Sequence, residues 1–288
     1  MAGILFTSFE LGLLYALVVL GVFLTFRILN FPDLTVDGSF VTGAAATAIA
    51  IQAGVPGLVA ILAGFLAGFL AGSLTAFLHI RLGIGKILAG ILSLSMLYSI
   101  NLRLMGGPNI SLLWQENIIG WLKTPLNDIN AIIFLFVIIV VAKVFIDWFL
   151  QTEFGLRLRA TGDNESTAQS FAINTKTTKF FGIAISNGLV GLSGGLIAQF
   201  QGFADISMGV GVIILGFAAL MLGEALTTSN KIPTITTVII LGAILFQVII
   251  NIALRLGLSG TDLKLVTALI VVIALVIGSN KKYLAYGK

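Results

Sequence analysis

The stretch Thr152–Lys179, TEFGLRLRATGDNESTAQSFAINTKTTK, is the longest polar and charge-rich segment of a 288-residue chain that is otherwise strongly apolar. The whole chain has 58% hydrophobic and only 10% charged residues, with a mean hydropathy of +1.11. Soluble domains usually carry about 25% charged residues. The composition therefore predicts an all-α integral membrane protein, in which this polar stretch lies outside the bilayer.

Composition also restricts the chemistry that the chain can perform. The sequence has no cysteine, which excludes disulfides and thiolate metal sites, and His79 is its single histidine. It contains neither a metalloprotease helix nor a nucleophile elbow, and Gly83–Lys86 lacks the spacing of a phosphate-binding loop. We expect no metal site, no cofactor bound by this chain and no enzymatic activity. The net charge of +4 gives no reason to expect a nucleic-acid partner.

Apolar runs bounded by polar residues, Gly or Pro predict about nine transmembrane helices, with a range of eight to ten, because about 20 residues cross a hydrocarbon core. The predicted spans are 4–28, 39–54, 56–80, 87–105, 129–151, 179–200, 208–226, 232–253 and 263–279. The second and seventh spans are short. The first 26 residues contain no Lys or Arg and so lack the basic region of a cleaved signal peptide, and we expect the first span to be retained.

The segment between the fourth and fifth spans, residues 106–128, mixes apolar and polar residues and includes Trp114 and Trp121. Tryptophan is enriched at membrane–water interfaces. This pattern predicts an external interfacial segment with a surface-lying helix.

The distribution of basic residues predicts the orientation. With the amino terminus outside, eleven Lys and Arg residues fall on the cytoplasmic side and four on the external side. This bias follows the positive-inside rule. It predicts that the loop 152–178 and the carboxyl-terminal tail 280–288 are cytoplasmic.

Two short turns resemble each other. Phe31–Val36 (FPDLTV) and Phe203–Met208 (FADISM) share the pattern F-x-D-[LI]-[ST]-[VM], and each precedes a short span rich in small residues. Spans one to four, about 4–105, would then correspond to spans six to nine, about 179–279. Because only the fifth span separates them, the two copies would form an inverted-topology repeat within a single domain, 1–288. Chance resemblance between two short turns is the alternative.

Burying an acidic residue at membrane depth costs free energy, so such residues usually have a functional or structural role. Asp33 and Asp37 flank the first turn, where they would either cap the second helix or face a water-filled path. Glu224 lies near the cytoplasmic end of the seventh span and could simply be solvated. Lys143 and Asp147 are four residues apart on one helix, which predicts a structural ion pair.

A stripe of small residues in the third span, Gly64, Gly68 and Gly72, permits another helix to approach closely. The sixth span carries a similar set that includes Gly191. We expect both sets to serve packing within the chain.

Inside the polar stretch, Thr161 and Asp163 can start a helix that runs to about Phe171, before Asn174 ends it. Ala168 lies three residues before Phe171, on the same helix face. A short amphipathic helix of this kind suits insertion into a groove of a partner protein. A solvated loop is an equally open alternative.

Three stretches carry a resemblance to a known family. They are the opening helix from Leu13 to Phe31, the segment Gly155–Thr175 with its RATGDN and INT runs, and the glycine-containing span Gly211–Leu226. Together they resemble the membrane subunits of ATP-binding-cassette (ABC) importers of the branched-chain amino acid permease type. The run FPDLTVDGS at 31–39 is similar to the tryptophan or tyrosine import subgroup. In the family a glycine often stands where this chain has Ala172.

The resemblance implies an inner-membrane ABC importer subunit that forms the path for a small solute, an aromatic or branched-chain-like amino acid. It implies cytoplasmic ATPase subunits that bind ATP and Mg, a second permease copy in a homodimer or heterodimer, and an extracytoplasmic solute-binding protein. The implied ATPase-coupling residues are Gly155, Arg157, Arg159, Thr161, Gly162, Asp163, Asn164, Ala168, Phe171 and Asn174. The candidate path residues are Phe31, Asp33, Thr35, Asp37, Phe203, Asp205, Ser207 and Glu224.

The sequence allows one other class of function and disfavours a second. A self-sufficient secondary transporter or channel could use the acidic side chains of Asp33, Asp37 and Glu224, since an inverted repeat alone allows it. An intramembrane enzyme is disfavoured by the missing catalytic motifs. Binding of an external ATPase to the loop 152–178 would separate the first class from the ABC subunit.

Overall fold

The computed structural model describes residues 2–113, 115, 129–227, 229, 231–256, 265–269 and 272. Six helices in these residues are long and apolar enough to cross a membrane: Phe6–Ile28, Gly57–Ile80, Lys86–Met105, Asn130–Gln151, Thr175–Gln201 and Ile232–Arg255. The predicted class, an all-α integral membrane protein, is confirmed. The predicted count of nine spans is not confirmed, and most of the ninth span, 263–279, lies outside the described residues.

The first half of the chain forms α1 (Ala2–Val22), which continues into the π-helical η1 (Phe23–Ile28), then α2 (Val36–Gln52), α3 (Gly57–Ile80) and α4 (Lys86–Met105). A strand β1 (Asn109–Ser111) precedes α6 (Ile129–Gln151). The remainder forms α7 (Glu153–Asp163), α8 (Glu165–Ser170), α9 (Thr175–Gln201), β2 (Phe203–Asp205), α10 (Val212–Ala225) and α11 (Ile232–Arg255).

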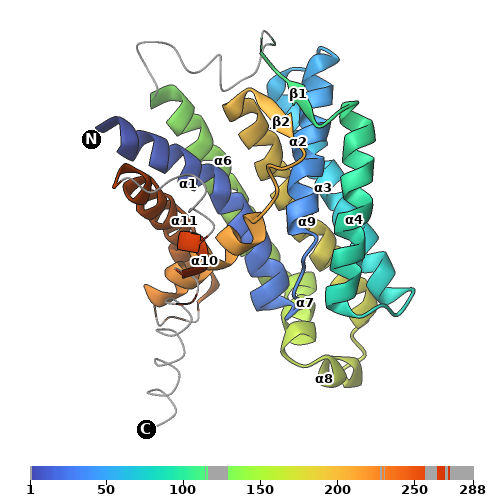
Figure 1. Ribbon diagram of the computed structural model, residues 1–288. Helices are drawn as coiled ribbons and strands as arrows, with labels where there is room; N and C mark the ends of the chain where they lie inside the picture. Colours follow the sequence, from blue (N-terminus) through green and yellow to red (C-terminus); the bar gives the residue numbers. More distant parts are fainter. Residues whose placement is uncertain are drawn as a thin grey trace.

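The helices form one bundle with two distinct ends (Figure 1). The short helices α7 and α8 lie at one end, which we call the α8 end. At the other, the ribbon end, β1 pairs with β2 in antiparallel register, with Ile110 opposite Ala204. Segments about 95 residues apart in the sequence therefore meet on the far side of the bundle from α8.

The two halves of the chain pack in related ways. Helix α3 packs on α9 as α11 packs on α1, and α2 contacts α9 as α10 contacts α1. The two similar turns also have the same hydrogen bond: the Asp33 carboxylate accepts from the Thr35 N–H at 2.9 Å, and the Asp205 carboxylate accepts from the Ser207 N–H at 2.7 Å. This agreement favours the repeat over chance resemblance.

The short helices that follow these turns run in opposite directions. At the end of α2, Gln52 donates to the Ser111 carbonyl of the ribbon at 3.1 Å. At the end of α10, Glu224 pairs with Arg27 of η1 at 2.9 Å, toward the α8 end. Helices of 17 and 14 residues are about 26 and 21 Å long, less than a hydrocarbon core of about 30 Å. Both are therefore too short to cross it alone. Their opposite directions are what an inverted repeat requires, while the predicted domain boundaries stay predictions.

Glycines bring α3 and α9 into backbone contact. A Cβ atom at Gly191 would lie 2.5 Å from the Gly64 carbonyl oxygen, and one at Gly68 would lie 2.9 Å from the Gly191 Cα. Side chains larger than hydrogen have no room there. The predicted packing role of these glycines within the chain is confirmed.

Some element boundaries differ from the predicted ones for local reasons. Helix α9 begins at Thr175 rather than 179, because the Asn174 side chain caps it by accepting from the Thr177 N–H at 3.1 Å. Helix α10 begins at Val212 rather than 208, because Gly211 has a φ of +90° and starts the helix only after the turn.

The segment 106–128 differs from the predicted surface-lying helix where it is described. Asn109–Ser111 is a strand, and Leu112 is buried with its N–H donating to the Gly202 carbonyl at 2.8 Å. Backbone pairing with the turn after α9 outweighs the interfacial pattern at these residues. Residues 114 and 116–128, with both tryptophans, lie outside the described residues.

Candidate functional site

The polar stretch after α6 forms two helices instead of one. The Thr152 hydroxyl accepts from the Gly155 N–H at 3.3 Å and caps α7. The chain then becomes extended at Asn164, with φ −156° and ψ 105°, and the Asn164 side chain accepts from the Thr167 N–H at 3.0 Å to cap α8. The prediction of one helix from Thr161 to Phe171 was wrong, because Asn164 interrupts it and α7 precedes it.

Two glycines allow α7 to pack closely against the bundle. A Cβ atom at Gly162 would overlap the Ile28 carbonyl oxygen of η1, and one at Gly155 would lie 2.5 Å from the Cα of Leu150 in α6. Leu158 between them is fully buried. Helix α7 therefore contacts both α6 and the end of α1.

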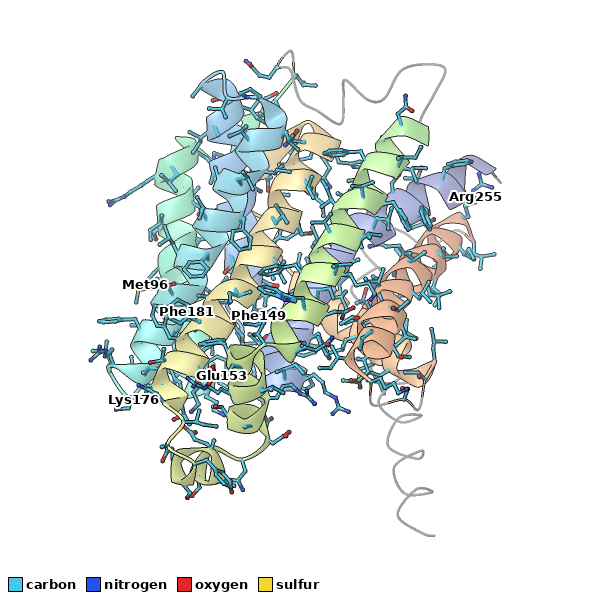
Figure 2. The ribbon with its side chains drawn as sticks, turned by 180° about the vertical axis from the view of Figure 1, so that it is seen from behind. Met96, Phe149, Glu153, Lys176, Phe181 and Arg255 are labelled. Atoms are coloured by element: carbon cyan, nitrogen blue, oxygen red, sulfur yellow. The ribbon has the colours of Figure 1, made fainter. Side chains whose placement is uncertain are left out.

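Aromatic side chains add a third contact, to α9. The Phe154 ring of α7 lies 5.8 Å from that of Phe149 in α6 and 6.0 Å from that of Phe181 in α9. Figure 2 shows the labelled Phe149 and Phe181 on the neighbouring helices α6 and α9, just inside the α8 end. A displacement of α7 would thus reach three membrane helices together.

Helix α8 presents Phe171 to solvent but hides Ala168. Phe171 is 77% exposed, whereas Ala168 is 2% exposed and packs inside the chain. The expected shared apolar face is therefore wrong. Phe171 is the C-cap that follows α8, and the chain then bends at Ala172, whose φ is +58°.

An ion pair fixes α8 to α9. The Lys179 ammonium lies 2.5 Å from the Glu165 carboxylate, and Lys179 itself is buried. Its hydrogen bond and charge hold the pKa of the Glu165 carboxyl below its usual range, despite an opposing effect of partial burial. Glu165 is therefore an ionised anchor at neutral pH.

The coupling candidates divide into two groups by burial. Those that hold the segment onto the bundle are Gly155, Thr161, Gly162 and Ala168, of which Thr161 donates to the Arg157 carbonyl at 2.8 Å. Those that are exposed are Arg157, Asp163, Asn164, Phe171 and Asn174, while Arg159 is half-buried. Arg157 forms an ion pair with Glu153. Glu153 and Lys176, both labelled in Figure 2, lie at the α8 end.

The first turn lies in a closed polar cluster. Asn187 of α9 donates to the Asp33 carboxylate at 2.6 Å and accepts from the Ser39 hydroxyl at 2.6 Å, while the hydroxyls of Thr35 and Thr75 are 2.6 Å apart. All five residues are at most 2% exposed. Asp33 and Thr35 therefore do not line an open path in this conformation.

Asp37 has a different environment, between two helix starts. From the first turn of α2, its carboxylate accepts from the N–H groups of Gly211 at 3.1 Å and Ile213 at 2.8 Å, both at the start of α10. The capping role considered for Asp37 is thus real, but the capped helix belongs to the other half of the chain.

Two cavities flank the turn that leads into α10. One, about 550 Å³, lies among α2, α4 and the turn 206–210, and the other, about 590 Å³, lies among α1, α10, α11 and the same turn. Asp37 and Val210 line both cavities, and Ser207 lines the first. Among the candidate path residues, the structure brings Asp37 and Ser207 together at a cavity.

The other path candidates lie elsewhere. Phe31 is buried with its ring 5.3 Å from that of His79, and Phe203 is 43% exposed on the ribbon. Asp205 accepts from the Ser207 hydroxyl within its turn, and Glu224 pairs with Arg27. The predicted pair of Lys143 and Asp147 is confirmed at 2.5 Å.

Sequence reasoning missed several polar residues that the structure places in the bundle. Asn187 organises the closed cluster, and Asn101 and Tyr98 line the first cavity. A signal was available, because asparagines within the apolar spans 87–105 and 179–200 are costly and mark functional or structural polar sites. Within the described part of the chain, no group of three His, Cys, Asp or Glu residues could hold a metal ion.

The long apolar helices and the two oppositely directed short helices are those of a multi-pass membrane protein. The sequence matches the family described as branched-chain amino acid transport system / permease component over residues 4–278. The chain belongs to this family of ABC transporter permeases, whose members are not themselves enzymes.

Relatives of similar length support the assignment. A tyrosine transport system permease protein of Clostridioides difficile (strain R20291) is 39% identical over 268 residues, covering 93% of this chain and 89% of the relative. An uncharacterized protein of Rickettsia prowazekii (strain Madrid E) is 34% identical over 284 residues, covering 94% and 96%. In fold, the chain is similar to an ABC transporter in an inward-facing conformation, with a TM-score of 0.52 and 18% identity over 96% of this chain and 86% of that one.

Proposed function

We propose that this permease subunit carries a small amino-acid-like solute across the bacterial cytoplasmic membrane, driven by a separate ABC ATPase that docks on α7 and α8. The observation that carries the proposal is the exposed Phe171 ring, which stands on a short helix fixed to the bundle. A large aromatic side chain in water is a typical anchor for a pocket on a partner.

The contacts of α7 and α8 support a mechanical role. Glu165 holds α8 to α9 through Lys179, and Gly162 holds α7 against η1. The α9 helix also carries Asn187, which bonds to the turn at Asp33. A push on Phe171 would therefore be passed through packed elements to the interior of both halves.

The ATPase would bind ATP and Mg, since this sequence has no phosphate-binding loop. The excess of basic residues at the α8 end favours a cytoplasmic position for it, with the amino terminus outside and the carboxyl terminus inside. A second permease copy and an extracytoplasmic solute-binding protein complete the proposed importer. The name of the Clostridioides difficile relative favours an aromatic amino acid as the solute.

The alternative, an ion-driven transporter without an ATPase, gains no support from the acidic residues. Asp33 bonds to Asn187, Asp37 caps α10, and Glu224 pairs with Arg27. Each carboxylate already has a hydrogen-bond or ion-pair partner within the described residues, and no observation favours a role of these carboxylates in ion coupling.

The test replaces Phe171 by Asp and, separately, combines Arg159→Glu with Asp163→Lys. Both variants should fold but lose co-purification with the ABC ATPase encoded beside the permease, together with ATP-driven uptake. Phe203→Asp is the matched control, because it places the same charge on an exposed phenylalanine at the opposite end of the bundle. Retention of the complex by the Phe171 and Arg159 variants would refute the docking site.

A further inference from the structure

We infer that the cavity among α2, α4 and the turn 206–210 is a transit site that recognises the primary ammonium group of the solute. This inference rests on the proposed transport of an amino-acid-like solute. It names the chemical group of the solute that the permease itself would bind. The cavity measures about 550 Å³, within the range of about 300–1,000 Å³ that is usual for small-molecule sites.

The first element of the site is the Asp37 carboxylate. Two backbone N–H groups of α10 occupy one acceptor position on each of its oxygens. A carboxylate offers about four such positions, so about two are left for a ligand. The amino ends of α2 and α10 meet at this carboxylate, and Asp37 lines the cavity.

The second element is the side-chain oxygen of Asn101 in α4. Asn101 is 1% exposed and lines the cavity, and its Oδ1 atom has no hydrogen-bond partner among the described residues. A buried acceptor that is left unpaired costs free energy. A hydrogen-bond donor of a ligand in the cavity would remove this cost.

The remaining wall fits the rest of such a solute. The ring of Tyr98 and the aliphatic side chains of Leu94, Val41 and Val210 line the cavity, and its described lining contains no Lys or Arg. An ammonium group would meet the oxygens of Asp37 and Asn101, and an apolar or aromatic body would meet Tyr98 and Leu94. A solute that is only anionic would find no cationic partner there.

The second cavity provides a useful contrast. It also reaches Asp37 and is lined by three amide side chains, Gln201, Gln247 and Asn251. None of the three has a buried side-chain atom that lacks a hydrogen-bond partner among the described residues, and Asn251 donates to the Ser8 hydroxyl at 3.0 Å and to the Gln247 carbonyl at 3.1 Å. The unpaired acceptor therefore distinguishes the cavity beside α4.

The experiment measures binding of three probes to the permease–ATPase complex in lipid nanodiscs. The probes are L-tyrosine, tyramine, which keeps the amine without the carboxylate, and 3-(4-hydroxyphenyl)propanoate, which keeps the carboxylate without the amine. We expect tyrosine and tyramine to compete for one site and the propanoate to bind at least about tenfold more weakly, a loss of about 1.4 kcal/mol. Equal binding of the propanoate, or no binding of either amine, overturns the inference.

Variants separate ligand recognition from folding. Asn101→Leu should weaken tyramine binding about tenfold while leaving the melting temperature unchanged or higher, because it removes an unpaired buried amide. Ser93→Ala is the control: its hydroxyl on the same helix is also buried and unpaired among the described residues, but it does not line the cavity. Asp37→Asn should weaken binding further, and Asn101→Leu keeps the test valid if that variant does not fold.

Uptake by the same complex distinguishes this inference from the proposed function. If wild-type complex transports tyrosine and Asn101→Leu transports it equally well with unchanged affinity, the ammonium site is refuted while the transport role stands. If the wild type binds no ATPase, the proposed function itself fails, whatever the binding of the amines to the permease.

Discussion

Gly162→Ala tests whether the close contact between α7 and η1 couples movement of α7 to the membrane helices. The added Cβ would overlap the Ile28 carbonyl oxygen and lie 2.8 Å from its carbonyl carbon, while ordinary contact begins at 3.4 Å. The carbonyl carbon alone would require a shift of 0.6 Å, the difference between 3.4 and 2.8 Å, and the overlapping carbonyl oxygen requires helix α7 to move away from η1 by more than that. Overpacking of this kind costs about 1–3 kcal/mol. We expect a lower melting temperature and less uptake per ATP hydrolysed.

The measurements are thermal unfolding in detergent and the ratio of solute uptake to ATP hydrolysis in proteoliposomes. Gly107→Ala is the matched control, because an added Cβ there meets nothing within 4 Å and its φ is not positive. ATPase co-purification should persist in both variants, since Phe171 remains exposed. If Gly162→Ala matches Gly107→Ala in both measurements, α7 does not transmit motion through η1.

Three further predictions follow from single contacts. Ala172→Gly should raise the free energy of unfolding by about 0.5–1 kcal/mol in thermal denaturation, because it relieves the left-handed conformation at φ +58°; a lower stability would contradict this. Glu165→Gln should destabilise by less than about 1 kcal/mol at pH 7. Because the folded pKa of Glu165 is lowered by Lys179, this difference should be full above the ordinary value of about 4.3 and vanish as pH falls through the folded value; a pH-independent difference would exclude the ion pair as its cause. A double-mutant cycle of Asp147→Asn and Thr236→Val should give a coupling of about 0.6–1.7 kcal/mol, since the Thr236 hydroxyl donates to Asp147 at 2.6 Å between α11 and α6; additive effects would rule the bond out.

Structural features that depend on residues close together in the sequence were predicted well. Apolar runs located the six described helices that are long enough to cross a membrane. The spacing of Lys143 and Asp147 gave their ion pair, and the glycines of α3 gave its close contact with α9. The matching turns at Asp33 and Asp205 carry the same local hydrogen bond, which residue identity alone specifies.

Features that depend on distant parts of the chain could not be predicted in this way. No local pattern indicates that Asp37 caps a helix 174 residues away, or that Asn101 ends beside the same turn. The single predicted helix at 161–171 failed for a local reason, because Asn164 competed successfully with Asp163 as a cap. Burial of Ala168 depended on tertiary packing that its neighbours in sequence do not reveal.

The contact between α2 and the turn before α10 has a consequence for how such a chain can be built. When the two similar turns are superposed by sequence, Asp37 corresponds to Gly209, and a Cβ at Gly209 would overlap the Asp37 carbonyl oxygen. A residue on a twofold axis meets its own equivalent, so identical half-chains would bring two aspartates together here. The amino ends of α2 and α10 each carry a partial charge of about +0.5, so the single carboxylate of Asp37 balances them and a second carboxylate would not be balanced. Joining both halves in one polypeptide allows this position to hold Asp once and Gly once, which a symmetric pair of half-length chains could never do.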